Sequence, residues 1–413
     1  MNKARLKSRW KMLLIFLAVA GPGIITSNVD NDAGGIATYS IAGAHFGYSL
    51  LWSLVPIMVA LIIIQEMSAR MGVVTGKGLS DLIRERFGVR ITVYLLSALV
   101  LTNFGNVIAE FAGVASSLEI FAIPKWASVS ASALLVWLLV LKGTYRSVEK
   151  VFLVACLFYV TYIISGFLAK PDWSLVKDSL IRPSFQLSAG SLAMLIGLVG
   201  TTIAPWMQFY LQASVVEKDI KVKDYKYSRS DVILGSIVVT LVAGFIILTC
   251  AATLFKAGVR VETAKDAALA LKPLAGKYCS ALFAFGLLNA SLFAASILPL
   301  STAFVVCEGM GWEDGVNKKF SEAPQFYGLY SLLIFLGAGI VILPGIPLFP
   351  LIYISQVING IVLPAILVFM LILINNKKLM GDYVNKKIYN LISWATVIVL
   401  TVLSLAFFFY LLT

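Results

Sequence analysis

Apolar segments long enough to cross a lipid bilayer recur along this chain almost from end to end. Of its 413 residues, 60% are hydrophobic and only 13% are charged. A membrane-spanning helix needs about 20 mostly apolar residues, and only helices and closed barrels satisfy their backbone groups in lipid. The sequence therefore predicts an all-α polytopic membrane protein, with no soluble domain long enough to fold alone. We expect about eleven transmembrane helices, near residues 13–43 (broken), 47–70, 92–121, 127–142, 147–169, 188–216, 230–255, 276–307, 325–343, 348–374 and 387–411.

The distribution of positive charge predicts the orientation in the membrane. If the N-terminus is cytoplasmic, 24 of the 33 Lys and Arg residues fall in cytoplasmic segments, as the positive-inside rule requires. Eleven spans then leave Thr413 outside the cell. The net charge of +12 reports this topology and contact with anionic lipid, and it does not indicate a nucleic-acid partner. We expect a multi-pass protein of the cell membrane, and the sequence leaves its oligomeric state open.

Few residues in this chain suit catalysis or a resident cofactor. The four cysteines lie in or near apolar spans without close pairing, which favours small buried hydrophobic side chains over disulfides or a zinc cluster. The chain has no His-Glu-x-x-His, no nucleophile elbow and no phosphate loop, and its one histidine is His45. We therefore predict that the protein is not an enzyme and holds no cofactor.

An acidic stretch interrupts the first span near mid-depth, at Asp30-Asn31-Asp32-Ala33-Gly34-Gly35. A carboxylate at the centre of a membrane helix costs about 2.5 to 3.5 kcal/mol. The paired glycines favour an unwound backbone, which survives at this depth only inside protein or beside a water-filled cavity. We expect a broken helix with a cation site.

A second break is predicted within residues 197–207. Pro205 lacks an amide hydrogen, so the carbonyl of Thr201 loses its helical donor, and the carbonyls of Thr201 and Thr202 become available as ligands. A proline-kinked span with small packing residues is the alternative. Five spans separate the two breaks, as expected of two inverted five-helix repeats with a site between discontinuous helices. We place the repeats at about 13–169 and 188–374, followed by an extra helix at about 387–411, all within one transporter domain, 1–413.

Several segments resemble the Nramp family of divalent-metal transporters, in order and over nearly the whole chain. The most specific is the stretch Gln65–Leu79 after the second span. Further matches are Tyr145–Glu149, Ser355-Gln356 with Leu363-Pro364, and Leu379-Met380-Gly381. The resemblance implies the LeuT-type architecture, with the metal site between spans one and six.

The same resemblance points to site residues, and it departs from the family pattern where metal selectivity is decided. Asp32-Ala33-Gly34-Gly35 stands where the family has Asp-Pro-Gly-Asn, so the aspartate is kept and the asparagine ligand becomes Gly35. Ala204-Pro205-Trp206 stands for Met-Pro-His, so the thioether and the histidine are both absent. Oxygen ligands suit Mg²⁺ and Mn²⁺, whereas sulfur favours softer ions. The pattern resembles the Nramp-related magnesium transporters. The expected metal-site residues are Asp32, Gly35, Thr201, Ala204 and Gln356.

Some polar residues allow more than one interpretation. Asp32 serves as ligand or as a helix cap, and Gln356 as ligand or as an interhelical contact. Asp30 bonds ligand waters, attracts ions in an outer vestibule, or is a plain solvated acid. Glu110 matches a family glutamate of the proton route, but the aspartate expected three residues earlier is Val107. We expect His45 at the surface.

The expected function is uptake of Mg²⁺, with Mn²⁺ as a second substrate, by alternating access without proton coupling. One alternative is a proton-coupled importer of Mn²⁺ or Fe²⁺, with Glu110 carrying the coupling alone. Another is a LeuT-type transporter of an amino acid or amine, since a fold does not determine its substrate.

Overall fold

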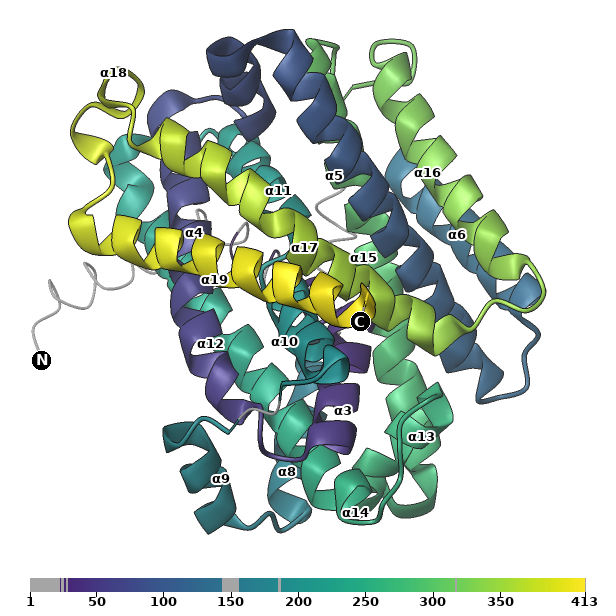
Figure 1. Ribbon diagram of the computed structural model, residues 1–413. Helices are drawn as coiled ribbons and strands as arrows, with labels where there is room; N and C mark the ends of the chain where they lie inside the picture. Colours follow the sequence, from purple (N-terminus) through teal and green to yellow (C-terminus); the bar gives the residue numbers. More distant parts are fainter. Residues whose placement is uncertain are drawn as a thin grey trace, which may run out of the picture.

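Helices packed side by side make up the protein (Figure 1). The computed structural model describes residues 23, 26, 29–142, 156–184, 187–315 and 318–412, and none of these residues lies in a β-strand. The described α-helices are α3 (Ala33–Phe46), α4 (Leu54–Thr75), α5 (Leu79–Glu119), α6 (Lys125–Lys142), α8 (Val160–Leu168), α9 (Trp173–Ile181), α10 (Ala189–Thr202), α11 (Pro205–Glu217), α12 (Tyr225–Cys250), α13 (Ala264–Ala268), α14 (Lys272–Ala275), α15 (Cys279–Met310), α16 (Pro324–Ile342), α17 (Leu348–Ile374), α18 (Lys377–Met380) and α19 (Lys387–Leu412).

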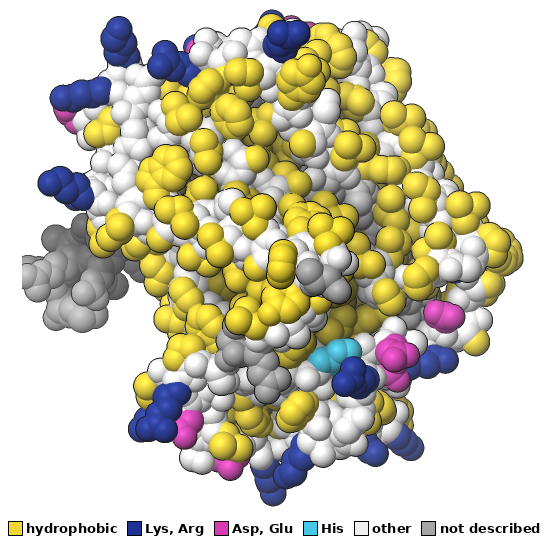
Figure 2. Space-filling model, viewed as in Figure 1, with side chains coloured by type: hydrophobic (Ala, Val, Ile, Leu, Met, Phe, Trp, Pro, Cys, Tyr) yellow, Lys and Arg dark blue, Asp and Glu magenta, His cyan; other side chains and the backbone are white. Residues whose placement is uncertain are grey.

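Eight helical segments of the described residues are long and apolar enough to cross a membrane, and all eight coincide with predicted spans. A ninth, α6, is apolar but shorter. The predicted spans 13–43 and 147–169 lie partly outside the described residues, so the total of eleven stays a prediction, as do the two inverted repeats. Hydrophobic side chains cover most of the visible surface, and Lys and Arg side chains gather toward its two ends (Figure 2).

Two long helices, α5 and α15, pack against each other and carry much of the interior. A break in α5 at Gly88, whose φ of 81° is accessible to glycine, separates a short amphipathic segment from the span that follows. Farther along, a Cβ at Gly113 would lie 2.3 Å from the hydroxyl oxygen of Ser291 on α15 and 2.5 Å from the Cβ of Ala33, the first residue of α3. This close approach places α5 beside the break that precedes α3.

The helices α10 and α17 touch through their backbones. A Cβ at Gly200 would lie 2.0 Å from the carbonyl oxygen of Gln356 and 2.3 Å from the amide nitrogen of Gly360. Glycine is therefore required here for contact and not for flexibility. The contact brings the second break, which follows α10, next to Gln356.

A buried ion pair joins elements at the end of the molecule where α18 lies. The Arg70 guanidinium bonds Glu66 at 3.1 Å, the carbonyl oxygen of Tyr383 at 2.8 Å and the side-chain oxygen of Asn385 at 2.5 Å. Tyr225 donates to the other oxygen of Glu66. These bonds tie α4 to α12 and to the connection before α19, among segments that the predicted topology places together on one side of the membrane.

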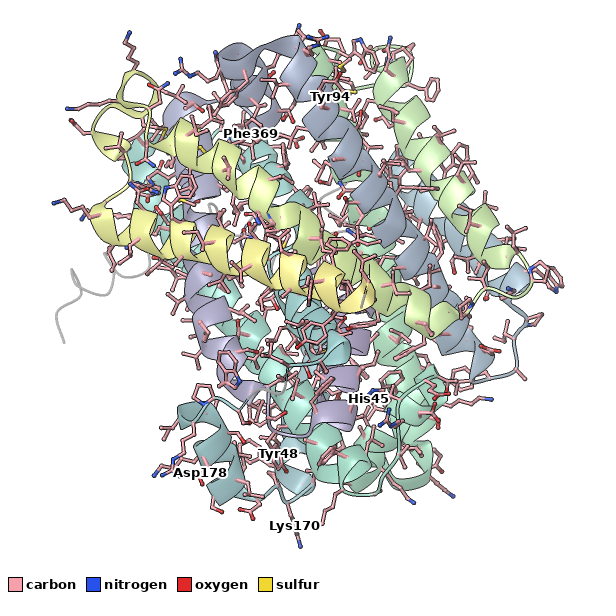
Figure 3. The ribbon with its side chains drawn as sticks, viewed as in Figure 1. His45, Tyr48, Tyr94, Lys170, Asp178 and Phe369 are labelled. Carbon is pink, nitrogen blue, oxygen red and sulfur yellow. The ribbon has the colours of Figure 1, made fainter. Side chains whose placement is uncertain are left out.

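The opposite end of the molecule carries α9, α13 and α14. Tyr94 and Phe369 lie toward the α18 end, while His45, Tyr48, Lys170 and Asp178 lie toward the other (Figure 3). We refer to these as the α18 end and the α9 end.

Candidate metal site

The first break is present where the sequence predicts it, and its helical boundary is at Asp32. Asp30 and Asn31 form a turn, Asp32 has extended backbone, and α3 begins at Ala33. The Asp32 carboxylate accepts a 2.8 Å hydrogen bond from the amide of Gly35, which caps the helix. The capping interpretation of Asp32 is thus correct for one of its oxygens, and it leaves the other for further contacts.

The paired glycines are not the unwound residues, contrary to our expectation. Gly34 and Gly35 lie in the first turn of α3. A Cβ at Gly34 would lie 2.1 Å from the amide nitrogen of Gln356, and one at Gly35 would lie 2.5 Å from the carbonyl oxygen of Asp30. Glycine is needed at both positions because neighbouring atoms occupy the space of a side chain.

A second carboxyl group meets Asp32 from α5. The Glu110 side chain is fully buried, and one of its carboxyl oxygens has no hydrogen-bond partner among the described residues. One oxygen of Glu110 also accepts a 3.3 Å bond from the amide of Ala33. A carboxyl group buried in this way, beside the start of the helix that Asp32 caps, needs a proton or a cation.

Asp30 lies inside the protein, so the interpretation as a plain solvated acid is wrong, while the roles toward ligand waters or an outer vestibule stay predictions. Only 2% of its surface is exposed, and neither carboxylate oxygen has a hydrogen-bond partner among the described residues. Its carbonyl oxygen lies under Gly35, beside the ring of Tyr39. A buried carboxylate in such surroundings needs a proton or a cation.

The second break separates α10 from α11. The helix α10 ends at Thr202, Ile203 and Ala204 are not helical, and Pro205 is the first residue of α11. Proline starts a helix well because its missing N–H would have no partner there. A kinked continuous helix is therefore excluded.

A hydrogen bond joins α3 to the end of α10, at the second break. The Tyr39 hydroxyl is 2.8 Å from the hydroxyl of Thr202, which donates in turn to the carbonyl oxygen of Leu198. Thr201 is buried, and its hydroxyl has no partner among the described residues. The carbonyl oxygen of Ala204 accepts bonds from the amide of Met207 at 3.1 Å and the side chain of Gln208 at 3.3 Å.

Gln356 reaches the first break from α17. It is buried, its nitrogen lies over Gly34, and a Cβ at Gly34 would also lie 2.9 Å from Asp32 Oδ1. Its amide bonds the hydroxyl of Ser355 and the side chain of Asn359, each at 2.9 Å. The structure therefore brings Gln356 and Asp32 together, and also fulfils the alternative of a polar contact.

Sequence reasoning missed the partners of Gln356. Asn359 is paired with Asn106 of α5 through two amide hydrogen bonds of 3.0 and 3.1 Å. Both asparagines were visible as polar residues in apolar spans, each about one helical turn from a residue that we did single out, Gln356 or Glu110. Their pairing depends on the packing of α5 against α17, which no local pattern predicts.

Oxygen dominates the ligand atoms that surround the breaks. Within the described residues, no three His, Cys, Asp or Glu side chains are arranged to hold a metal ion. Trp206 is buried and packs on Tyr210, with ring centroids 5.9 Å apart. Cys250, Cys279 and Cys307 are free and buried, in agreement with the sequence, while the side chain of Cys156 lies outside the described residues.

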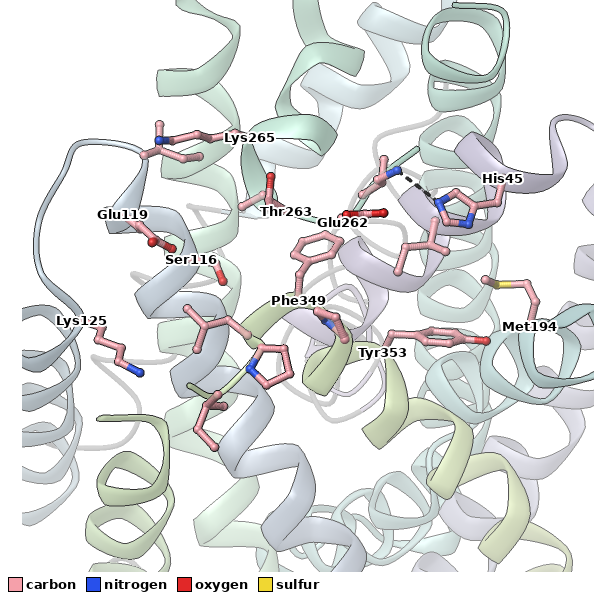
Figure 4. Close-up of a pocket in the computed structure, with 18 of the residues that line it drawn as sticks. His45, Ser116, Glu119, Lys125, Met194, Glu262, Thr263, Lys265, Phe349 and Tyr353 are labelled. Carbon is pink, nitrogen blue, oxygen red and sulfur yellow. Dashed lines mark hydrogen bonds between the residues drawn. The ribbon is translucent and has the colours of Figure 1, made fainter. Parts of the chain in front are cut away.

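A cavity of about 910 Å³ opens at the α9 end (Figure 4). Its lining includes Glu119, Glu262 and Lys265, and His45, which accepts a 3.2 Å bond from the amide of Val261. His45 is half-buried in this wall and not fully at the surface. Tyr353 also lines the cavity, and it lies about one helical turn before Gln356 on α17.

Comparison with known proteins defines the class of this fold. A crystal structure of the Eremococcus coleocola manganese transporter, bound to an aromatic bis-isothiourea compound, aligns with a TM-score of 0.79 at 24% identity, covering 96% of this chain and 86% of that one. MhsT in complex with L-phenylalanine aligns at 0.56 and 15% identity, covering 94% of this chain and 98% of that one. The fold is that of a LeuT-type membrane transporter, as predicted.

The family follows from the sequence itself. Residues 23–410 match the family described as natural resistance-associated macrophage protein-like. Two relatives named divalent metal cation transporter MntH are 29% identical (Deinococcus radiodurans; 94% of this chain, 88% of the relative) and 30% identical (Ralstonia nicotianae; 96% and 91%). The chain belongs to the Nramp family, whose members are multi-pass membrane transporters and not enzymes. Of the motifs behind the predicted resemblance, Tyr145–Glu149 lies outside the described residues.

Proposed function

We propose that this protein transports divalent metal cations by alternating access, through a site between the two broken helices. The observation that carries the proposal is the pair of buried carboxylates at the first break, Asp30 and Asp32, opposite the break before Pro205. Ionisable groups inside a membrane are costly and mark ion pathways. Asp30 has no hydrogen-bond partner among the described residues, and a cation bound at this break would compensate its charge.

The proposed ligands are oxygen atoms from three elements. Asp32 supplies a carboxylate oxygen, Thr201 supplies its carbonyl oxygen from the second break, and Gln356 supplies its amide oxygen. Ala204 borders the ion, and its small side chain leaves space there. Gly35 acts through Asp32, to which it donates its N–H. Asp30 lies close enough to the break to bond waters held by the ion.

The choice of ion rests on two arguments, one from similar proteins and one from the chemistry of the ligands. The description of the Eremococcus coleocola protein as a manganese transporter favours Mn²⁺, while the names of the two MntH relatives specify only a divalent metal cation. The ligand chemistry favours hard ions in general, because Ala204 and Trp206 replace the thioether and imidazole of the family pattern. Mg²⁺ keeps several waters when bound, and the missing side chains leave room for them. We therefore propose Mn²⁺ and Mg²⁺ as substrates.

A second candidate function is proton-coupled import of Mn²⁺ or Fe²⁺, and the names of the relatives fit it better than magnesium uptake. The buried carboxyl group of Glu110 beside the start of α3 also favours it, because an intramembrane acid next to the proposed ion site is a suitable carrier for the coupled proton. Val107 and Trp206 offer no further titratable group. Coupling is not needed for accumulation, since a divalent ion gains about 4.6 kcal/mol across 100 mV, enough for more than a thousandfold gradient.

We also propose the orientation predicted from the sequence, with the N-terminus and the α18 end in the cytoplasm. The basic segments around Arg70, Tyr225 and Tyr383 gather at that end, in support of this assignment. The cavity at the α9 end then opens to the outside and leads toward the site.

Uptake into liposomes tests these proposals together. Purified protein is offered Mn²⁺, Mg²⁺, Ca²⁺, Cd²⁺ and phenylalanine under an imposed potential, with a pH dye inside. We expect uptake of Mn²⁺ and Mg²⁺, while saturable phenylalanine uptake without metal flux would overturn the proposal. Metal-dependent acidification that is lost in Glu110→Gln would establish the second candidate.

A further inference from the structure

Three buried side-chain amides form a continuous hydrogen-bonded chain beside the first break. Asn106 and Asn359 are 2% and 1% exposed, and they exchange two hydrogen bonds. The Asn359 nitrogen donates its second hydrogen to the Gln356 oxygen at 2.9 Å. Every polar atom of Asn359 is thus engaged, and its partners determine which way its amide faces.

In this arrangement the amide nitrogen of Gln356, and not its oxygen, faces the proposed position of the cation. The Gln356 oxygen accepts from Asn359, and its nitrogen donates to the hydroxyl of Ser355 and lies over Gly34, at the side of the Asp32 carboxylate. An amide binds a cation through its oxygen, because its NH₂ group is a donor only. A rotation of about 180° around the terminal torsion, which is broad and roughly two-fold for Gln, exchanges the two atoms.

Rotation of Gln356 alone would bring two hydrogen-bond donors face to face. After rotation its NH₂ group would face the NH₂ group of Asn359. If Asn359 also turns, its oxygen accepts from Gln356, and a matching turn of Asn106 restores the two bonds between the asparagines. The three amides then satisfy one another in two settings, and only the second presents the Gln356 oxygen toward α3. In that setting the Ser355 hydroxyl, which now accepts from Gln356 and donates to the carbonyl oxygen of Ile352, turns to donate to the Gln356 oxygen.

We infer that these three amides form a two-setting switch, in which Asn359 is the positioning residue that determines whether Gln356 offers nitrogen or oxygen to a metal ion beside Asp32. The inference rests on the proposed function, and it adds two residues to the determinants of ion binding. A cation attracts the amide oxygen and repels the NH₂ group, so binding moves the chain into its second setting.

A carboxylate at position 359 tests the switch because it accepts hydrogen bonds but cannot donate them. Asn359→Asp allows only the setting in which Gln356 donates to it and turns its own oxygen to the ion. The matched control is Asn106→Asp, which adds the same charge nearby. A carboxylate at 106 meets one donor and one oxygen of Asn359 in either setting, so it favours neither.

The measurement is the Kd for Mn²⁺ by calorimetry at pH 8, on wild type and both variants, each with and without Gln356→Ala. We expect Asn359→Asp to bind Mn²⁺ about fivefold to tenfold more tightly than Asn106→Asp, the worth of about one hydrogen bond. With Gln356→Ala, the two aspartate variants should agree within about twofold. An equal advantage of Asn359→Asp in both backgrounds would overturn the switch.

A measurement without mutation keeps the inference testable if a buried aspartate prevents folding. Wild-type protein labelled with ¹⁵N at asparagine is titrated with Mg²⁺, and the side-chain amide signals are followed. We expect the signals of Asn106 and Asn359 to shift together with Mg²⁺ occupancy. The signal of Asn103, which lies on the same helix as Asn106 and bonds Thr302 at 2.9 Å, should stay unchanged. Unchanged Asn106 and Asn359 signals in protein that binds Mg²⁺ would contradict the switch, whereas a wild type that binds neither ion would contradict the proposed function instead.

Discussion

Gly35→Ala should damage the site although it adds a single methyl group. The added Cβ would lie 2.5 Å from the carbonyl oxygen of Asp30 and 3.3 Å from the ring of Tyr39. The carbonyl is a backbone atom, and it must move by roughly 1 Å to reach an ordinary contact distance. That movement displaces Asp30 and disturbs the hydrogen bond from the Gly35 amide to the Asp32 carboxylate. Asp30 and Asp32 are the proposed charged groups of the site.

The expected magnitude follows from two opposing contributions. Overpacking of this kind lowers the stability of the folded protein by about 1 to 3 kcal/mol, and alanine in place of glycine within a helix raises it by about 1 kcal/mol. We therefore expect a net loss of stability of up to about 2 kcal/mol. Transport should fall by about tenfold or more, since about 1.4 kcal/mol of lost ion binding already corresponds to tenfold.

The control is Gly105→Ala, in the interior of α5. A Cβ at Gly105 would meet nothing within 4 Å, so this variant should transport normally and unfold no earlier than wild type. The assays are Mn²⁺ uptake into liposomes and thermal unfolding in detergent. If Gly35→Ala transports as well as Gly105→Ala, the close packing of the first break does not support the site as we argue.

Two further substitutions probe ion choice and pH dependence. Ala204→Met should shift selectivity in competition uptake toward Cd²⁺ and away from Mg²⁺, because a thioether binds softer ions and fills space that a retained water would occupy. A wild type that already prefers Cd²⁺ strongly to Mn²⁺ would contradict the argument that the site selects hard ions. In the connection after α15, burial raises the pKa of Asp314 to about 6. The folded state therefore favours the protonated form, and stability should rise as pH falls from about 7 toward 5. Asp314→Asn should remove much of that rise in thermal melts, and an unchanged pH profile would contradict the assignment.

Much of the fold could be predicted from the sequence because membrane helices are constrained by their own composition. The eight long spans were predictable from apolar length alone. The break at Asp30–Asp32 and the start of a new helix at Pro205 were also predictable, since charge at mid-depth and a missing amide hydrogen act locally.

The rest depended on packing between distant segments. Gly34 and Gly35 were interpreted as flexible, whereas their role is to admit Gln356 and the backbone of Asp30. The burial of Asp30 was equally hidden, because only the surrounding helices determine whether a turn residue meets water. The relation of Asn106 to Asn359 spans 253 positions in the chain, and no periodicity connects them.

Transport by Asp32→Ala is the most direct test of the central claim that a divalent cation crosses through the first break. Uptake of Mn²⁺ into liposomes under an imposed potential is compared for wild type, Asp32→Ala and the control Asp178→Ala, which changes an exposed acid on α9. We predict normal uptake by wild type and by Asp178→Ala, and none by Asp32→Ala that has folded to the same monodisperse protein. Uptake by Asp32→Ala at the wild-type rate would contradict the account.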